Sequence, residues 1–409
     1  MVTVLVVGGG AAGQVAAWRA ASLGHAVTLV EANGRLGVKL RISGGGKCNV
    51  THEGAPRELL KAFAQEQARF LRPALHAFGS AEVVELLRRE GVPTQARENG
   101  RIFPLDRPGS AGAVVAAFEG LVERAGVTVC RGLRATGVTG QAPRLRTLRV
   151  DEEALTADVF ILATGGASYP ETGTRGEVPG WLAPLGIPVK PWFPALAPIP
   201  LRNPRPAWEG VPLREGVLRL SAGKDGRRLA EFAGDLVFTR FGVSGPAPLE
   251  LSQATERARR AGAAWLSYAA VTPPAEAVDA ALQTDQRTNP RLLVETWLRR
   301  HLPERIVAAV VAEAGPALSP MLKDLTRGGR KLLVEQVTAL PLGEPQAVSL
   351  ARGEVAAGGI ALAAVDPHTM ALRGWDNLRV CGELLDIDGP VGGYNLQAAF
   401  STGYLAGSI

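Results

Sequence analysis

The sequence predicts an α/β fold in which a domain built on a parallel sheet is interrupted by a large insertion. Residues 2–31 pass from an extended segment through an Ala-rich helix to a second extended segment, which is a βαβ unit. The apolar run 157–163 stops at a glycine pair, as a buried parallel strand does. The last section, 377–409, returns to the opening pattern, so we expect it to rejoin the first domain.

The elements of this first domain follow from the hydrophobic periodicity and from the glycines and prolines that bound each segment. We expect strands over 2–7, 26–31, 127–130, 157–163 and 378–381, and helices over 11–23, 80–90, 111–125 and 396–406.

The middle of the chain has a different character. Prolines crowd residues 184–212, where they disfavour both a helix and a central strand, so we place a boundary near Lys190. Short strands and turns follow to about residue 268, and a helical pattern continues to about 336. The predicted domains are therefore 1–190 with 346–409, and an insertion at 191–345 that comprises a β-barrel-like part (191–272) and a small helical lobe (273–338).

Composition narrows the possible functions. The chain has 409 residues, 46% of them hydrophobic, 21% charged, and a net charge of +6 that is spread without a block of like charge. We therefore expect no nucleic-acid partner, no membrane segment and a cytoplasmic location, while the oligomeric state is not indicated. The three cysteines, Cys48, Cys130 and Cys381, show neither disulfide-framework nor metal-ligand spacing, so no metal is predicted.

Residues 8–13 read Gly-Gly-Gly-Ala-Ala-Gly and match the G-x-G-x-x-G fingerprint between a predicted strand and a predicted helix. The first glycine permits the turn, the second admits a pyrophosphate, and the third lets helix and strand pack closely. Glu31, eighteen residues after Gly13, ends the second strand, where a carboxylate can accept ribose hydroxyls and disfavours NADP. The turn predicts a dinucleotide but does not separate NAD from FAD.

Three further segments carry a resemblance to a known family. They are RISGGGKCNVT at 41–51, ATGGASYPETG at 163–173, and GELLDIDGPVGGYNLQ at 382–397. All three resemble signatures of the bacterial YhiN-like, or HI0933-like, flavoproteins, and the resemblance runs nearly end to end. It implies FAD bound in a Rossmann-like domain similar to that of glutathione-reductase-like flavoproteins, with the middle inserted. Lys47 departs from the commoner Arg and keeps the charge without the planar fork.

Physical reasoning assigns parts of the cofactor to these segments. The loop around Ser43 offers successive N–H groups to oxygen atoms. Glu383 can accept ribitol hydroxyls, and Gly392 and Gly393 can aim N–H groups at the flavin pyrimidine. The candidate FAD-binding residues are Gly8, Gly10, Ala11, Ala12, Gly13, Glu31, Ala32, Lys39, Ser43, Gly44, Gly45, Lys47, Cys48, Asn49, Ala163, Thr164, Gly165, Gly166, Gly382, Glu383, Asp386, Gly392, Gly393, Tyr394, Asn395 and Leu396.

No Ser/His/Asp triad, H-E-x-x-H motif or pair of catalytic carboxylates stands out, so we expect the cofactor to perform the redox step. Lys47, Arg101 and Tyr169 are the candidate catalytic residues, because two cations could hold an anionic or carbonyl group and a phenol could donate a proton. The alternatives are an internal ion pair for Arg101 and a packed aromatic for Tyr169. Cys48 is interpreted as a buried structural thiol.

These observations predict an FAD-dependent oxidoreductase that transfers hydride between flavin and a small-molecule substrate. NAD(P)H is a candidate transient donor, because only one dinucleotide fingerprint is present. The resemblance implies activities that range from reduction of conjugated enones, including bile-acid-like steroids, to amine oxidation. The alternatives are an RNA-modifying flavoprotein and a non-catalytic flavin-binding regulator.

Overall fold

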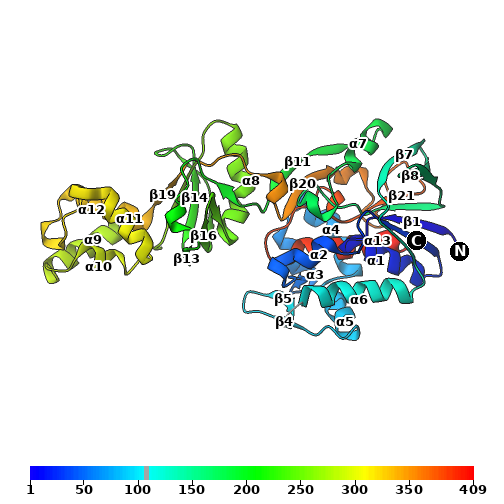
Figure 1. Cartoon of the computed structure of the whole chain (residues 1–409), viewed down its shortest axis with the longest axis horizontal. Helices are drawn as coiled ribbons and strands as arrows, with labels where there is room; N and C mark the ends of the chain where they lie inside the picture. The colour runs from blue at the N-terminus through cyan, green and yellow to red at the C-terminus, as the bar shows by residue number, and fades with distance from the viewer. Residues whose placement is uncertain (106–109) are drawn as a thin grey trace. The chain divides into compact units, whose positions relative to one another are not determined.

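A computed structural model describes residues 1–105 and 110–409. The chain divides into two compact units, both visible in Figure 1. Unit 1 consists of Met1–Phe193 and Leu350–Ile409, and unit 2 of Pro194–Ser349. The boundaries drawn from the sequence lie at 190 and 346, a few residues from these.

Unit 1 is built on a five-stranded parallel sheet in the order β21-β10-β1-β2-β6. Its strands are β1 (Thr3–Val7), β2 (Ala26–Glu31), β6 (Thr128–Arg131), β10 (Val159–Leu162) and β21 (Leu378–Val380). Only β10 separates the first strand of the chain from the last. Side chains at the centre of the sheet, such as Val6, Leu29 and Phe160, are completely buried, which fits their unbroken apolar pattern.

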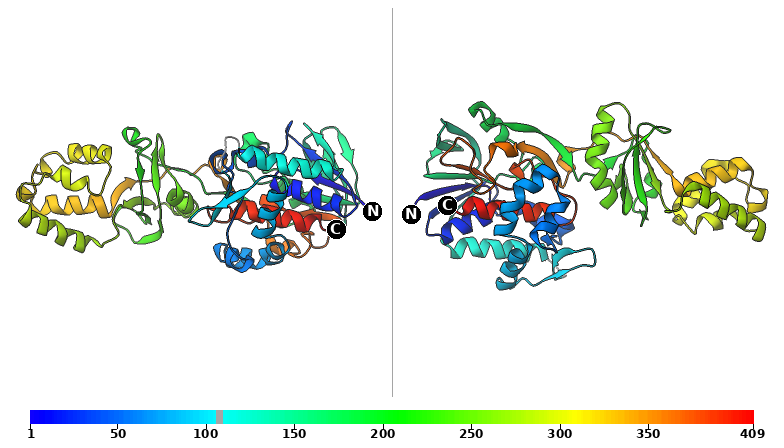
Figure 2. Two further views of the ribbon diagram at one scale, coloured as in Figure 1. Left: turned by 90° about the horizontal axis from the view of Figure 1, so that it is seen from below. Right: turned by 180° about the vertical axis from the view of Figure 1, so that it is seen from behind.

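The first and last helices of the chain pack directly against each other. They are α1 (Ala11–Ser22) and α13 (Tyr394–Gly407), blue and red in Figure 1 and again side by side in both views of Figure 2. Two glycines of α13 permit this approach: a Cβ on Gly403 would lie 2.3 Å from the Ala12 oxygen, and one on Gly407 would lie 2.3 Å from the Ala16 oxygen. The two chain ends therefore fold together.

Further elements of unit 1 surround this sheet. They are α2 (Val38–Ile42), β3 (Thr51–His52), α3 (Pro56–Leu59), the 3-10 turn η2 (Leu60–Ala62), α4 (Gln65–Ala77), α5 (Ser80–Arg89), β4 (Thr94–Ala96), β5 (Arg101–Pro104), α6 (Ser110–Arg124), β7 (Ala135–Gln141), β8 (Arg144–Val150), β9 (Glu153–Leu155), α7 (Val178–Leu182), β11 (Val189–Ala195) and β20 (Val355–Ile360). The stacked rings of Phe118 and Phe400, with centroids 5.0 Å apart, join α6 to α13.

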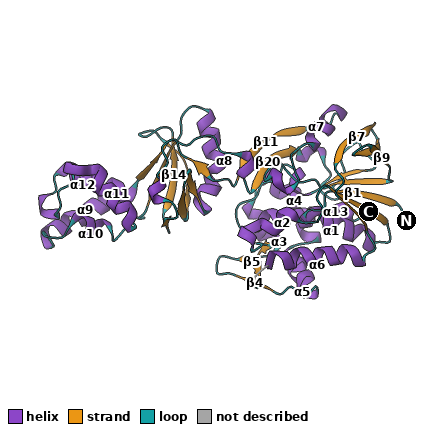
Figure 3. Cartoon of the chain, viewed as in Figure 1, coloured by secondary structure: helices purple, strands orange, loops and turns teal. Residues whose placement is uncertain are grey.

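Unit 2 contains antiparallel strands and a group of helices, drawn orange and purple in Figure 3. The strands form two four-stranded sheets, β12-β17-β16-β13 and β15-β14-β18-β19. Their bounds are β12 (Ile199–Pro200), β13 (Pro212–Leu213), β14 (Val217–Ser221), β15 (Arg228–Ala233), β16 (Leu236–Thr239), β17 (Gly242–Ser244), β18 (Trp265–Ala269) and β19 (Leu340–Gly343). The helices are α8 (Pro246–Arg260), α9 (Ala275–Thr288), α10 (Val294–Leu298), α11 (Glu304–Ala314) and α12 (Arg327–Thr338).

Two buried polar side chains of unit 2, Tyr268 and Glu256, are hydrogen-bonded within the unit. The Tyr268 hydroxyl accepts the Gly216 N–H at 2.9 Å, and the buried Glu256 carboxylate bonds Arg259, Arg260 and the Val348 N–H. Hydrogen bonds from the two arginines hold the pKa of Glu256 down, to about 2, against the opposing effect of its burial. Across the described residues of both units, no helix is long and apolar enough to cross a membrane.

Candidate cofactor site

The turn between β1 and α1 uses most of its glycines for packing. Gly8 has φ +98°, a left-handed conformation that favours glycine. A Cβ on Gly9 would lie 2.4 Å from a methyl carbon of Leu36, and a Cβ on Gly13 would lie 1.8 Å from the Gly8 oxygen. The third glycine of the fingerprint therefore does what its spacing predicts, because it lets the helix sit against the strand.

Gly10 differs from its neighbours. Its φ of −77° suits any residue, and a Cβ built on it meets no protein atom within 4 Å. Neither backbone nor packing requires glycine here. The space beside it lies at the start of α1, whose first turn has no side-chain cap and no acidic residue. An open position beside uncapped N–H groups fits a diphosphate.

Glu31 closes the other side of this turn. Its Oε2 accepts the Gly9 N–H at 2.7 Å, and its Oε1 accepts both the backbone and the side-chain N–H of Asn33 at 2.7 Å. The Asn33 amide in turn donates to the Thr172 carbonyl at 3.0 Å. The structure thus brings the end of the 163–173 segment to the end of β2. A ribose contact for Glu31 stays a prediction.

The glycine-rich segment after α2 presents an exposed backbone. Gly44, Gly45 and Gly46 have φ values of +57°, +66° and +83°, and residues 44–47 are exposed. Lys47, the last of them, lies on this exposed surface. Cys48 turns inward, completely buried, and burial raises the pKa of its thiol to about 11. A protonated buried thiol agrees with a structural role for Cys48.

Asn49 connects this segment to the start of the last helix. Its side-chain nitrogen donates to the Ile102 and Thr51 carbonyls at 3.1 and 3.0 Å, and its side-chain oxygen accepts the Gly393 N–H at 2.9 Å. In this orientation of the Asn49 amide the Gly393 N–H donates to its oxygen, and a flavin contact for Gly393 stays a prediction. Gly393 itself has φ +90°, and a Cβ there would lie 2.4 Å from the Thr51 oxygen.

The loop that precedes α13 is held by its own side chains. Asn395 accepts the Gly389 N–H at 2.7 Å and donates to the Gly389 carbonyl at 2.8 Å. The Tyr394 ring stacks on His52, with centroids 4.7 Å apart. Asp386 bonds Lys190 at 2.6 Å and accepts the Gly358 N–H at 3.0 Å. α13 begins at Tyr394, two residues before the expected start of the helix at 396.

A second cluster joins four segments that are distant in the sequence. The Lys39 ammonium lies 2.6 Å from Glu383 Oε2 and 2.7 Å from the Ser168 hydroxyl, which itself donates to Glu383 Oε1 at 3.3 Å. The Ala356 N–H donates to the same Oε1 at 2.9 Å. The structure thus brings the predicted residues Lys39 and Glu383 together. The ribitol contact proposed for Glu383 would have to share its carboxylate oxygens with these bonds.

Tyr169 lies beside this cluster in a strained conformation. Its φ of +50° is uncommon for a residue with a side chain, and its N–H donates to the Ala351 carbonyl at 3.1 Å. Burial raises the pKa of the phenol, and the carboxylates of Glu354 and Glu171 raise it further. The phenol is therefore protonated at neutral pH.

Glu354 is the site residue that sequence reasoning missed, since no motif contains it. The protein packed around it raises the pKa of its carboxyl, while Arg101 and Lys39 offset part of that rise. The residue is nevertheless exposed to solvent. Arg101 forms no ion pair within residues 1–105 and 110–409, although its charge acts on Glu354.

The chain resembles known proteins along nearly its whole length. The family model described as the HI0933-like protein Rossmann domain matches residues 2–409. A 3-dehydro-bile acid delta(4,6)-reductase of Clostridium scindens is 30% identical, over 98% of this chain and 97% of that protein. A ribosomal RNA dihydrouridine synthase of Haemophilus influenzae is 27% identical, over 98% and 96%.

Solved structures resemble the chain in fold. The 3-ketosteroid delta1-dehydrogenase of Sterolibacterium denitrificans superposes with a TM-score of 0.55 at 14% identity, covering 99% of this chain and 98% of that one. A 3-ketosteroid-delta4-(5alpha)-dehydrogenase of Rhodococcus jostii gives 0.53 at 16% identity, with 100% and 96% covered. Within the described residues, no group of three His, Cys, Asp or Glu side chains could hold a metal ion.

Proposed function

Because the chain belongs to the HI0933-like family of FAD-dependent oxidoreductases, we propose that it reduces a carbon–carbon double bond conjugated to a carbonyl group. The activities for which two relatives are named share this chemistry. A 3-dehydro bile acid with 4,6 double bonds is a conjugated ketone, and the double bond of uracil that a dihydrouridine synthase saturates is conjugated to the C4 carbonyl. Saturating such a double bond takes a hydride at its carbon remote from the carbonyl and a proton at its other carbon.

The observation that carries the proposal is that the charge of Glu354 acts on the Tyr169 phenol and that the charge of Arg101 acts on Glu354. Reduced FAD, when bound, supplies the hydride. The carbonyl oxygen gains negative charge as the hydride arrives, and the Arg101 guanidinium would stabilise that charge. Tyr169 would give its proton to the carbon beside the carbonyl, since the raised pKa keeps the phenol protonated. Glu354 would return a proton to the phenolate.

The residues that would hold FAD are those around the turn and the last helix. The open position at Gly10 and the uncapped start of α1 suit the diphosphate, and the exposed backbone of residues 44–47 suits the ring edge. We propose NAD(P)H as a transient donor, because the single fingerprint leaves the flavin face as its place of contact.

The experiment is an anaerobic half-reaction. The purified protein is reconstituted with FAD, reduced chemically, and mixed with a 4,6-dien-3-one steroid or a uridine-containing RNA, while flavin reoxidation is followed by its visible absorbance. Reoxidation by one of these substrates, and not by its saturated analogue, supports the proposal. If neither substrate reoxidises the flavin of the fully FAD-loaded protein, the proposal is wrong.

Tyr169→Phe sharpens the same experiment. The variant should keep the FAD spectrum and substrate affinity but slow substrate-driven reoxidation by about 100-fold, within the range for loss of a general acid. Tyr404→Phe, whose hydroxyl forms no contact used in the mechanism, serves as the control and should leave the rate unchanged. An unaltered rate in Tyr169→Phe would remove the phenol from the mechanism.

A further inference from the structure

We propose that a hollow on unit 1, lined by Arg57, Lys61, Arg72 and His76 around Leu60, binds the phosphodiester groups of an RNA strand; we call it the basic hollow. The inference rests on the proposed function, because it makes a uracil base in RNA the conjugated substrate. It also revises the expectation, drawn from net charge alone, that no nucleic acid is a partner.

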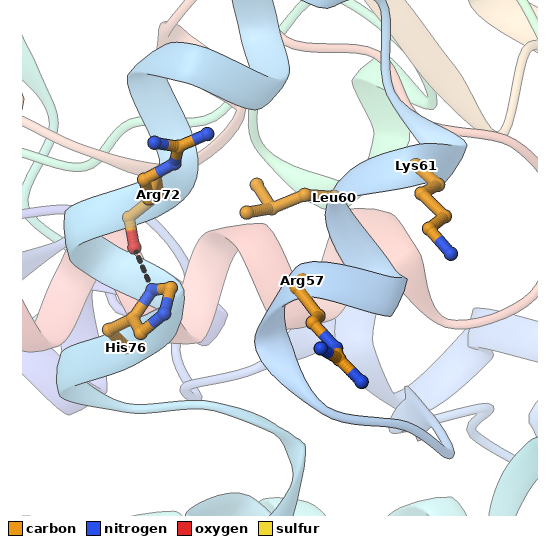
Figure 4. Close-up of a pocket in the computed structure, with 5 residues that line it drawn as sticks. All are labelled: Arg57, Leu60, Lys61, Arg72 and His76. Atoms are coloured by element: carbon orange, nitrogen blue, oxygen red, sulfur yellow. Dashed lines mark hydrogen bonds between the residues drawn. The ribbon is translucent and has the colours of Figure 1, made fainter.

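The basic hollow is a site of about 410 Å³ formed by α3, η2 and α4 (Figure 4). Leu60 projects between the two helical segments and forms an apolar floor. The Nδ1 of His76 donates to the Arg72 carbonyl at 2.8 Å, which fixes the imidazole on the outer face of α4. Arg57, Lys61, Arg72 and His76 are all exposed. A shallow site with an apolar centre and a cationic border can admit an extended chain.

The cations of the basic hollow differ from those of α5 in their ion pairing. Within the part of the chain that the structure describes, Arg57, Lys61 and Arg72 have no ion-pair partner. Arg88 and Arg89 on α5 show the usual arrangement, since both bond Glu85 at 2.7 Å. Unpaired cations that share a concave surface attract anions, and guanidinium groups suit phosphate oxygens through paired N–H donors.

The segment that carries the basic hollow also supports the loop before α13. Phe63 packs its ring edge-on against Tyr394, with centroids 6.0 Å apart, and a Cβ on Gly389 would lie 2.7 Å from that ring. Gln67 donates to Asp388 at 2.8 Å. An anionic strand held at the basic hollow is thus attached to the segment that positions the predicted flavin loop.

The number and spread of the cations favour a strand over a small anion. A single carboxylate needs one or two donors, whereas the cations here come from α3, η2 and α4, and no acidic side chain lines the hollow. Repeated phosphates along a backbone match such a spread, and specific contacts to a base then come from the catalytic site.

The test measures binding without catalysis. A fluorescent, uridine-containing single-stranded RNA is titrated with the FAD-loaded protein, and anisotropy is recorded from about 50 to about 200 mM KCl. The double variant Arg57→Ala with Arg72→Ala should bind about ten-fold more weakly and should lower the salt slope by about 1.4, or ~0.7 for each lost phosphate contact. The control, Arg88→Ala with Arg89→Ala, removes the same charge and should change affinity less than two-fold, or by under about 0.4 kcal/mol.

The outcomes separate cleanly. Equal losses of affinity in the two double variants would show general attraction of RNA to a basic protein. An unchanged affinity in the Arg57→Ala, Arg72→Ala variant would show that RNA does not bind at the hollow. Either result overturns the inference, as does absence of RNA binding by the unmodified protein. The visible FAD spectrum shows whether each variant is folded. Lys61→Gln is a milder variant, and it should lower the salt slope of RNA binding by about 0.7. Reduction of the steroid enone without RNA binding would overturn this inference alone, whereas loss of all enone reduction would overturn the proposed function.

Discussion

The two glycine-rich ends of the chain, the turn at residues 8–13 and the loop at 389–395, were both expected to present N–H groups to one cofactor, yet they use their residues differently. In the first turn, packing accounts for Gly9 and Gly13 but leaves Gly10 beside open space. In the last loop, the Gly393 N–H and the Asn395 side chain are both engaged by protein groups.

This difference shows that one signature mixes two kinds of residue. At some positions glycine is required because the backbone turns there or lies against another segment, and at others its missing side chain leaves room for a ligand. Sequence spacing alone does not separate them, whereas the surroundings of a Cβ do. The comparison predicts that substitutions at the first kind reduce stability and substitutions at the second reduce cofactor binding.

The largest effect is expected for Gly13→Ala. The new Cβ would lie 1.8 Å from the Gly8 oxygen, a backbone atom that can move only if α1 separates from β1. We expect a loss of about 3 kcal/mol or more in the free energy of unfolding, measured by urea denaturation. Gly180→Ala in α7, where a Cβ meets nothing within 4 Å, is the control and should change stability by less than about 0.5 kcal/mol. Equal stability of the two variants would contradict the packing role of Gly13.

Gly10→Val should weaken cofactor binding and leave stability unchanged, the reverse of Gly13→Ala. Because no protein atom lies near its Cβ, the apoprotein should keep its melting temperature, while the side chain fills the space expected for the diphosphate. We expect FAD to bind about 100-fold more weakly, which corresponds to about 2.7 kcal/mol. Gly10→Ala should fall between the variant and the unmodified protein. A Gly10→Val protein that purifies with full flavin content would show that the turn binds no diphosphate.

An intermediate effect is expected for Asn49→Ala, which removes the link between the second glycine-rich segment and α13. The change leaves the Gly393 N–H and the carbonyls of Ile102 and Thr51 without this partner. The free energy of unfolding should fall by about 1–3 kcal/mol. Asn289→Ala, at an exposed helix end, is the control and should have little effect. A loss of flavin without loss of stability would instead make Asn49 a direct cofactor ligand.

The parts of the fold that depend on local pattern could be predicted from the sequence. The βαβ unit, the return of the last section to the first sheet, and the packing role of Gly13 follow from periodicity and from short spacings. The stacking of α13 on α1 through Gly403 and Gly407 is a contact between chain ends, which no single-sequence pattern specifies.

The parts of the site that depend on distant contacts could not be predicted. Glu354 lies in no motif, and it matters only because folding brings it near Arg101 and Tyr169. The basic hollow was missed for a related reason: a net charge of +6 does not tell which cations have acidic neighbours. The ion pair of Arg88 with Glu85 is local, at i,i+3 on one helix, whereas the basic hollow forms only when folding brings α3, η2 and α4 together.

The smallest effect is expected for Asn395→Ala, which tests whether the last loop acts through its shape or through direct contact. The side chain bonds Gly389 through both its oxygen and its nitrogen, so its loss should loosen the loop, lower stability by about 1 kcal/mol and weaken FAD binding only several-fold. Asn395→Asp keeps the acceptor for the Gly389 N–H but loses the donor to the Gly389 carbonyl. Its stability and FAD affinity should lie between those of Asn395→Ala and the unmodified protein. If the alanine variant instead binds FAD as weakly as Gly10→Val at unchanged stability, the amide contacts the cofactor itself, and the two chain ends are more alike than their protein contacts indicate.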